Sequence, residues 1–198
     1  MKPAFVEVVD EATIRTRVAQ LGSEISRDYR SEDPVVIGVL KGSVPFLADL
    51  TRHLSPHIET DFLALTRFGH DGRVGIAMDI SIPVTDRSVL IVEDIVDTGL
   101  TLTTLRKMLV AKGAADVRTV ALIDKTTRRI VDVPVEYRGF EVGDEFLLGY
   151  GLDWEGRYRN VRSFWAVMDL ARLKADPQSF GPVQTVKADR AGTHIPPG

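Results

Sequence analysis

Short, continuous apolar runs recur along much of the chain, and helical patterns separate them. The runs at 34–40, 88–94 and 117–124 consist mostly of Val, Ile and Leu, which is typical of strands buried on both faces. Helical spacing of apolar residues extends from Asp10 to about Tyr29 and again from Thr101 to Lys112. Strands and helices in alternation predict an α/β fold with a mainly parallel sheet and helices on both faces.

Weaker signals complete this outline. We expect a helix through 44–54 capped by Ser43, a hairpin of strands 61–68 and 73–80, short strands or loops between 133 and 153, and a last strand at 163–170. From Ala175 onward, Pro, Gly and polar residues mix without periodicity. We therefore expect one domain over 1–174 and a flexible tail over 175–198.

Composition excludes several kinds of function. The 198 residues carry a formal net charge of −3 and no long basic block, which argues against sequence-independent nucleic-acid binding. The chain has no cysteine, so disulfides and thiolate chemistry are excluded, in keeping with a cytoplasmic location. The start of the chain lacks the pattern of a secretory signal, and no apolar run approaches the length of a membrane span.

One strand ends in an unusual cluster of acids. Residues 89–105 read VLIVEDIVDTGLTLTTL, so Glu93, Asp94 and Asp97 follow four apolar residues and precede a helical pattern. Side chains next to each other on a strand point to opposite faces, so Glu93 and Asp94 cannot both be surface groups in a sheet covered on both sides. Buried carboxylates need hydroxyl donors or a cation. A sugar diol with Mg²⁺ nearby would supply both.

The turn after these acids has the chemistry of an anion site. Asp97 to Thr101 connects a strand end to a helix start, where backbone N–H groups lack partners and the helix dipole favours negative charge. Gly99 allows close backbone approach, and Thr98 and Thr101 add hydroxyl donors. The alternative is an ordinary helix start with Asp97 or a threonine as the N-cap.

The whole run resembles the phosphoribosyl-diphosphate (PRPP) signature of type I phosphoribosyltransferases, and VEDIVDTGLTL resembles their purine-salvage branch, the hypoxanthine-guanine phosphoribosyltransferases. Three further motifs follow the order of that family: VLKGSVPFLADL at 39–50, ALIDKTTRR at 121–129 and FEVGDEFLLGYGLDWEGRYRN at 140–160. The resemblance covers about 35–169. It implies the type I phosphoribosyltransferase fold, with a small hood formed by the N-terminal segment and about 140–174.

This resemblance also implies a reaction. Such enzymes use Mg²⁺ and transfer phosphoribose from PRPP to N9 of a 6-oxopurine, releasing diphosphate. They commonly form dimers or tetramers, so a homo-oligomer is expected. The sequence leaves open the preference among hypoxanthine, guanine and xanthine. It also leaves open a phosphoribosyltransferase for another base, and a non-catalytic regulator that senses PRPP or nucleotides.

The resemblance assigns roles residue by residue around the sugar and its phosphates. The 5′-phosphate would lie on Asp97, Thr98, Gly99, Leu100 and Thr101, and Asp97 would be the general acid/base at purine N7. Glu93 and Asp94 would bind the ribose hydroxyls and shape the metal site. The diphosphate would bind Lys41, Gly42 and Arg159, with a strained or cis peptide expected at Leu40–Lys41.

Further roles concern the purine. Lys125 would donate to the 6-oxo group, Phe146 would stack on the base, the backbone of Leu147 would meet its edge, and Trp154 would help to wall it. Asp153 would take part in both purine and metal binding. Taken alone, Lys125 reads as a solvated loop residue and Phe146 as a core residue.

The sequence departs from the family at its mobile lid. The family's Ser-Tyr pair is replaced by Arg67 and Phe68, and the loop that follows is several residues shorter. We consider Phe68 a candidate cover for the reacting centre and Arg67 a candidate diphosphate contact. A plain tight hairpin is the alternative.

Overall fold

The computed structural model describes residues 4–54, 57–68 and 73–181. They belong to two compact units: a core unit, Glu11–Asp144, and a small unit, Met1–Asp10 together with Glu145–Gly198. The sequence places the start of the hood at about 140. Residues 137–141 instead pair with the large sheet, so the core unit continues to Asp144.

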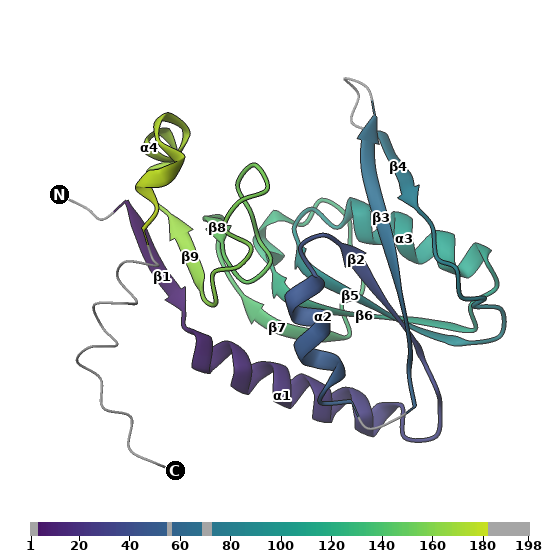
Figure 1. Cartoon of the computed structure of the whole chain (residues 1–198). Helices are drawn as coiled ribbons and strands as arrows, with labels where there is room; N and C mark the ends of the chain where they lie inside the picture. The colour runs from purple at the N-terminus through teal and green to yellow at the C-terminus, as the bar shows by residue number, and fades with distance from the viewer. Residues whose placement is uncertain (1–3, 55–56, 69–72, 182–198) are drawn as a thin grey trace, which may run out of the picture. The chain divides into compact units, whose positions relative to one another are not determined.

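The core unit contains a mainly parallel sheet, as the sequence predicts (Figure 1). Its order is β4-β3-β2-β5-β6-β7, and only the β3–β4 pair is antiparallel among the described residues. The strands are β2 (Val35–Leu40), β3 (Glu59–Phe68), β4 (Arg73–Met78), β5 (Ser88–Val96), β6 (Asp116–Asp124) and β7 (Tyr137–Glu141). The predicted hairpin is therefore β3–β4.

Helices cover both faces of this sheet. On one face, Ile37 of β2 belongs to the same buried cluster as Leu105 of α3 (Leu100–Ala111). The next residue, Gly38, faces the other way, against Leu47 of α2 (Val44–Thr51). α1 (Glu11–Asp28) buries the apolar stripe predicted for it. Alternate residues of β2 thus pack into the hydrophobic cores on the two faces of the sheet.

Three local predictions for the core unit are wrong. Ser43 stands at the N-cap position of α2 but makes no capping bond, because its buried Oγ donates instead to the Val39 carbonyl at 2.6 Å. The same helix ends at Thr51, short of the predicted end at 54. β5 is also longer than predicted, since its pairing with β6 continues to Val96. Glu93 and Asp94 therefore lie within the strand.

The small unit is built on an antiparallel sheet of order β1-β9-β8. Its strands are β1 (Phe5–Val9), β8 (Phe146–Leu148) and β9 (Phe164–Val167). The last strand is shorter than predicted because Asp169 accepts a hydrogen bond from the Arg172 N–H at 2.9 Å and starts α4 (Leu170–Ala175).

Packing continues beyond the predicted start of the tail at 175. Phe180 is only 6% exposed and makes edge-on ring contacts with Phe5, Tyr158 and Trp165, whose centroids lie 4.9, 5.1 and 5.7 Å away. Residues up to 181 therefore belong to the packed small unit. The rest of the predicted tail lies outside the described residues.

Candidate active site

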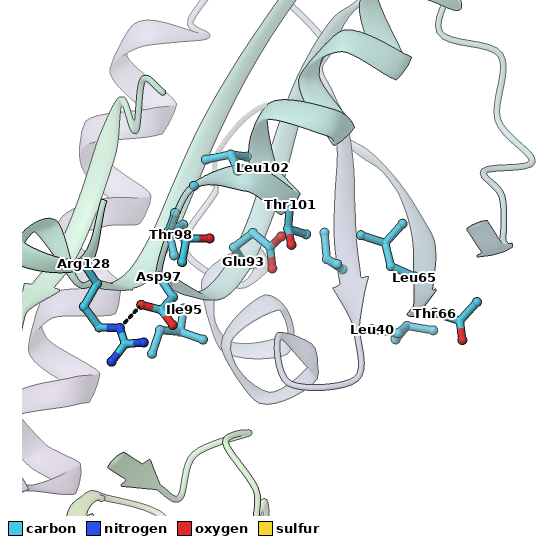
Figure 2. A pocket seen from close by; sticks show the side chains of 13 residues that line it. Leu40, Leu65, Thr66, Glu93, Ile95, Asp97, Thr98, Thr101, Leu102 and Arg128 are labelled. Carbon is cyan, nitrogen blue, oxygen red and sulfur yellow. Dashed lines mark ion pairs between the residues drawn. The ribbon is translucent and has the colours of Figure 1, made fainter. Parts of the chain in front are cut away.

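A cavity of about 580 Å³ lies at the carboxyl ends of the central strands of the core unit. Figure 2 shows the carboxylates of Glu93 and Asp97 and the hydroxyls of Thr98 and Thr101 among the side chains that line it. The lining residues come from strands β2, β3 and β5, the turn Asp97–Gly99, the start of α3 and Arg128. This is the edge at which ligands of parallel sheets bind.

Glu93 is the most buried carboxylate of this cavity. It is only 6% exposed, and burial, together with the negative charge of Asp94, raises its pKa well above the ordinary value. Desolvation disfavours the charged form of a carboxyl group. A ligand that brings hydroxyl donors or a cation to Glu93 would remove that penalty.

Asp94 faces the loop that follows β2. The α-carbon of Gly42 lies against its carboxylate so closely that an added β-carbon would be 1.5 Å from Oδ2. The preceding Leu40–Lys41 peptide bond is cis, as the resemblance implies. Lys41 and Gly42 thus lie beside the acidic strand, where the sequence predicts a diphosphate loop.

The turn from Asp97 to Thr101 is held from behind by the segment 129–131. Arg129 Nη1 donates to the Asp97 carbonyl at 2.7 Å, and the Ile130 N–H donates to the Thr98 carbonyl at 3.0 Å. Gly99 has a φ of 84°, and a β-carbon there would be 2.9 Å from the Val131 carbonyl oxygen. These contacts engage carbonyl groups of the turn. At the start of α3, the Leu100 N–H makes a long hydrogen bond of 3.5 Å to Thr98 Oγ1, a contact that an anion could replace.

Asp97 does not cap α3. The N-cap position is Gly99, and no side-chain capping bond is made there, so the capping interpretation of Asp97 is wrong. Its carboxylate instead forms an ion pair with Arg128, whose Nε lies 2.6 Å from Oδ1 (Figure 2). The Arg128 guanidinium also donates to Asp144.

Lys125 lies at the carboxyl end of β6, the strand next to β5. Its backbone N–H donates to the Val96 carbonyl at 3.0 Å, and the residue is only 6% exposed. Lys125 is therefore not a solvated loop residue. The pKa of the nearby Asp144 is lowered by the hydrogen bond from Arg128 and by the positive charges of Arg128 and Lys125.

The remaining predicted residues lie in the small unit. Phe146 is 36% exposed and packs edge-on against Trp154 with ring centroids 5.5 Å apart, while Leu147 is buried. Asp153 Oδ1 lies 2.7 Å from Arg159 Nη2, and Asp153 Oδ2 accepts from the Gly156 N–H at 2.7 Å. Asp153 and Arg159 thus neutralise each other.

The lid candidates are placed by their backbone alone. Arg67 and Phe68 end β3, but their side chains lie outside the described part of the structure, as do residues 69–72. The two residues before them, Leu65 and Thr66, line the cavity. The chain therefore leaves β3 beside the candidate site.

Sequence reasoning missed the role of Arg128 and Arg129. Arg129 pairs with Asp124, which is fully buried and lies 3.1 Å from Arg138 Nε. A signal was present in the sequence: two consecutive arginines follow the ALIDK strand end after two threonines and add positive charge to a chain segment predicted to lie near three acids. Within the described ranges, no group of three acidic or histidine side chains could hold a metal ion.

The fold and the site define an α/β protein whose cavity at the end of a parallel sheet has the chemistry to suit a phosphorylated, hydroxyl-rich ligand. A family model described as "Phosphoribosyl transferase domain" matches residues 7–155. The chain belongs to this family of phosphoribosyltransferases.

Curated relatives and solved structures agree with that assignment. A protein of Lactococcus lactis named hypoxanthine-guanine phosphoribosyltransferase is 41% identical over 158 residues, which cover 78% of this chain and 86% of the relative. A protein of the same name from Bacillus subtilis is 40% identical, with 78% and 88% covered. A crystal structure of a hypoxanthine-guanine phosphoribosyltransferase from Bacillus anthracis has a TM-score of 0.80 at 37% identity, covering 82% of this chain and 98% of the other.

Proposed function

We propose that this protein transfers phosphoribose from PRPP to N9 of hypoxanthine, guanine or both in purine salvage. The products are IMP or GMP and diphosphate. The observation that carries this proposal is one cavity lined by a buried carboxylate, Glu93, and by residues of the turn from Asp97 to Thr101. A ribose with a 5′-phosphate supplies the complementary hydroxyls and charge. The names of the relatives supply the base.

In the core unit, different residues bind the 5′-phosphate, the ribose and the diphosphate. Backbone N–H groups of the turn, with the hydroxyls of Thr98 and Thr101, hold the 5′-phosphate. Glu93 and Asp94 accept hydrogen bonds from the ribose hydroxyls, and Lys41 and Gly42 bind the diphosphate. Asp97 exchanges a proton with purine N7, because a carboxylate can accept that proton as the N9 bond forms.

The family resemblance assigns purine contacts to residues of each unit. Lys125 donates to the 6-oxo group and so selects oxo over amino purines. In the small unit, Phe146 stacks on the base, Leu147 contacts its edge through the backbone, and Trp154 forms part of the wall around the base. Arg159 binds the diphosphate, and its pairing with Asp153 orients its guanidinium before the ligand arrives.

Mg²⁺ fits this set of residues as a companion of PRPP. Mg²⁺ usually keeps several waters and binds one or two carboxylates together with phosphate oxygens, so no cage of protein ligands is needed. Glu93, Asp94 and Asp153 are the carboxylates we assign to it. When bound, it would neutralise charge on the leaving diphosphate.

Diphosphate release tests the proposal. The protein is incubated with PRPP, Mg²⁺ and, in turn, hypoxanthine, guanine, xanthine, adenine and uracil. We expect release with hypoxanthine or guanine; release with no base, or with uracil alone, contradicts the proposal. Asp97→Asn should lower kcat by roughly a hundredfold while PRPP still binds.

We further propose a cytoplasmic homo-oligomer, a dimer or a tetramer. The absence of cysteine is in keeping with that compartment. In the described part of the chain, no helix is long and apolar enough to cross a membrane. Light scattering of the purified protein measures the oligomeric state, and a monomer would contradict the proposal.

A further inference from the structure

Arg128 lies between two carboxylates at the edge of the candidate site. It ends the short 3₁₀ turn Thr126–Arg128 that follows β6, and it lines the same cavity as Asp97. Its Nε lies 2.6 Å from Asp97 Oδ1, and its Nη1 donates to Asp144 Oδ1. Figure 2 shows the guanidinium directed at one oxygen of the Asp97 carboxylate.

Geometry allows Arg128 to hold both acids at once. A guanidinium is planar, and its N–H groups point in fixed directions, so separate nitrogen atoms can serve separate carboxylates. Asp144 thereby fixes the arginine, and the arginine fixes one oxygen of Asp97. The second oxygen of Asp97 does not take part in this ion pair.

The neighbouring arginine holds the main chain of the same aspartate. Arg129 donates to the Asp97 carbonyl and is itself anchored by the fully buried Asp124. Two consecutive arginines therefore fix the backbone and the side chain of one residue. This double support exceeds what a simple turn requires. The backbone of the turn is already fixed by the hydrogen bond to the Thr98 carbonyl and by the positive φ of Gly99.

We propose that Arg128 is a positioning residue, held by Asp144, that orients the Asp97 carboxylate for proton transfer at purine N7. The inference rests on the proposed function. A general base must lie about 2.6–3.2 Å from the atom that carries the proton, so a carboxylate free to rotate spends less time in the reactive geometry. The Arg128 and Asp97 side chains are 43% and 44% exposed, so we expect their pairing to act on geometry more than on stability.

A double-mutant cycle separates positioning from a structural role. kcat and KM for PRPP are measured for Arg128→Ala, Arg128→Lys and Asp144→Asn, and for Arg128→Ala in the Asp97→Asn background. We expect Arg128→Ala to lower kcat about tenfold with less than about a threefold change in KM, and Arg128→Lys to restore part of the loss. In the Asp97→Asn background the same change should cost less than about twofold, because Arg128 acts through Asp97. Asp144→Asn should lower kcat about threefold.

Equal losses in both backgrounds would overturn the proposal, as would an unchanged kcat of Arg128→Ala. The ion pair is tested without substrate by the NMR signal of the Arg128 Nε–H, which should shift in Asp97→Asn. An unshifted signal contradicts the pairing. A wild-type protein that releases no diphosphate would overturn the proposed reaction and the positioning role with it, while the NMR signal still decides the ion pair.

Discussion

The Asp94 carboxylate lies so close to Gly42 that no side chain fits at residue 42. A β-carbon at 42 would lie 1.5 Å from Asp94 Oδ2 and 2.5 Å from its carboxyl carbon, which is far inside contact distance. The loop after β2 and the acidic strand β5 are therefore matched to each other at one point. The diphosphate loop and the ribose-binding acids proposed above share this contact.

Gly42→Ala should damage PRPP binding more than it damages the fold. The added methyl must push the Asp94 carboxylate or the 40–43 loop out of place, so we expect kcat/KM for PRPP to fall by at least about tenfold. Steady-state kinetics measure the loss. In Gly42→Ala/Asp94→Ala the steric conflict is gone, so the melting temperature should recover while activity stays low. Recovered activity would show that displacement of Asp94 is not the cause.

Glu93→Gln should stabilise the ligand-free protein at neutral and alkaline pH. The raised pKa of Glu93 means that the folded protein holds a proton that the unfolded chain releases above about 4.5. Stability is therefore lost as the pH rises from that value through the raised pKa, and the amide removes this loss. Thermal unfolding from pH 4 to 9 should show a gain that grows with pH, reaching about 2 °C or more.

The exposed Glu7 is the control for this measurement, and Glu7→Gln should move the melting temperature by less than about 1 °C at any pH. A gain for Glu93→Gln that is the same at pH 4 and pH 9 would point to packing instead of charge. The same variant should bind PRPP more weakly, because it loses the carboxylate proposed for the ribose hydroxyls.

Leu105→Ala should destabilise the core unit because Leu105 is 1% exposed and packs α3 against the sheet. The expected loss is about 2–5 kcal/mol of unfolding free energy. Leu100, at the start of the same helix, is 50% exposed, so Leu100→Ala should cost less than about 0.5 kcal/mol. Urea unfolding of both variants checks the difference, and equal losses would contradict the packing described for α3.

Phe180→Ala should destabilise the small unit, although the residue lies within the predicted tail. Phe180 is nearly buried among three aromatic rings, so its removal should cost about 3–5 kcal/mol. Met168→Ala is the control, since Met168 is 56% exposed. If both variants unfold at the same urea concentration, the aromatic cluster contributes nothing to stability.

Arg67→Ala tests the departure from the family's lid. If Arg67 contacts the diphosphate, KM for PRPP should rise severalfold. Arg87→Ala is a matched control. Arg87 pairs with Glu59 at 2.7 Å and directly precedes Ser88, the first residue of β5, whereas Glu93 lies toward the other end of that strand. Unchanged KM and kcat in Arg67→Ala would leave the plain hairpin as the better interpretation.

The alternation of strands and helices and the turn at 97–101 could be predicted because both depend on local sequence. Apolar runs identify buried strands, and a strand–turn–helix motif indicates backbone N–H groups that an anion can use. The ion pair of Arg128 with Asp97 could not be predicted in this way. It depends on the order of β5 and β6 in the sheet, which brings their two following loops together.

Ser43 and Phe180 show why other local predictions were wrong. Ser43 has a capping residue's chemistry, but burial brings the Val39 carbonyl within reach of its hydroxyl. Phe180 follows a stretch with the composition of a linker, yet an aromatic pocket receives it. In both cases a tertiary contact decides the conformation, and composition or propensity alone gives no sign of it.

The hydrogen bonds from residues 129–131 to the turn at 97–98 also bear on how such a protein can evolve. One short segment supports the turn proposed to bind the 5′-phosphate and continues directly from the loop that carries Lys125. A substitution that reshapes this segment to admit a new base would also disturb that turn. We therefore expect base preference to diverge through residues outside 129–131, and this segment to vary little among relatives that keep the same donor.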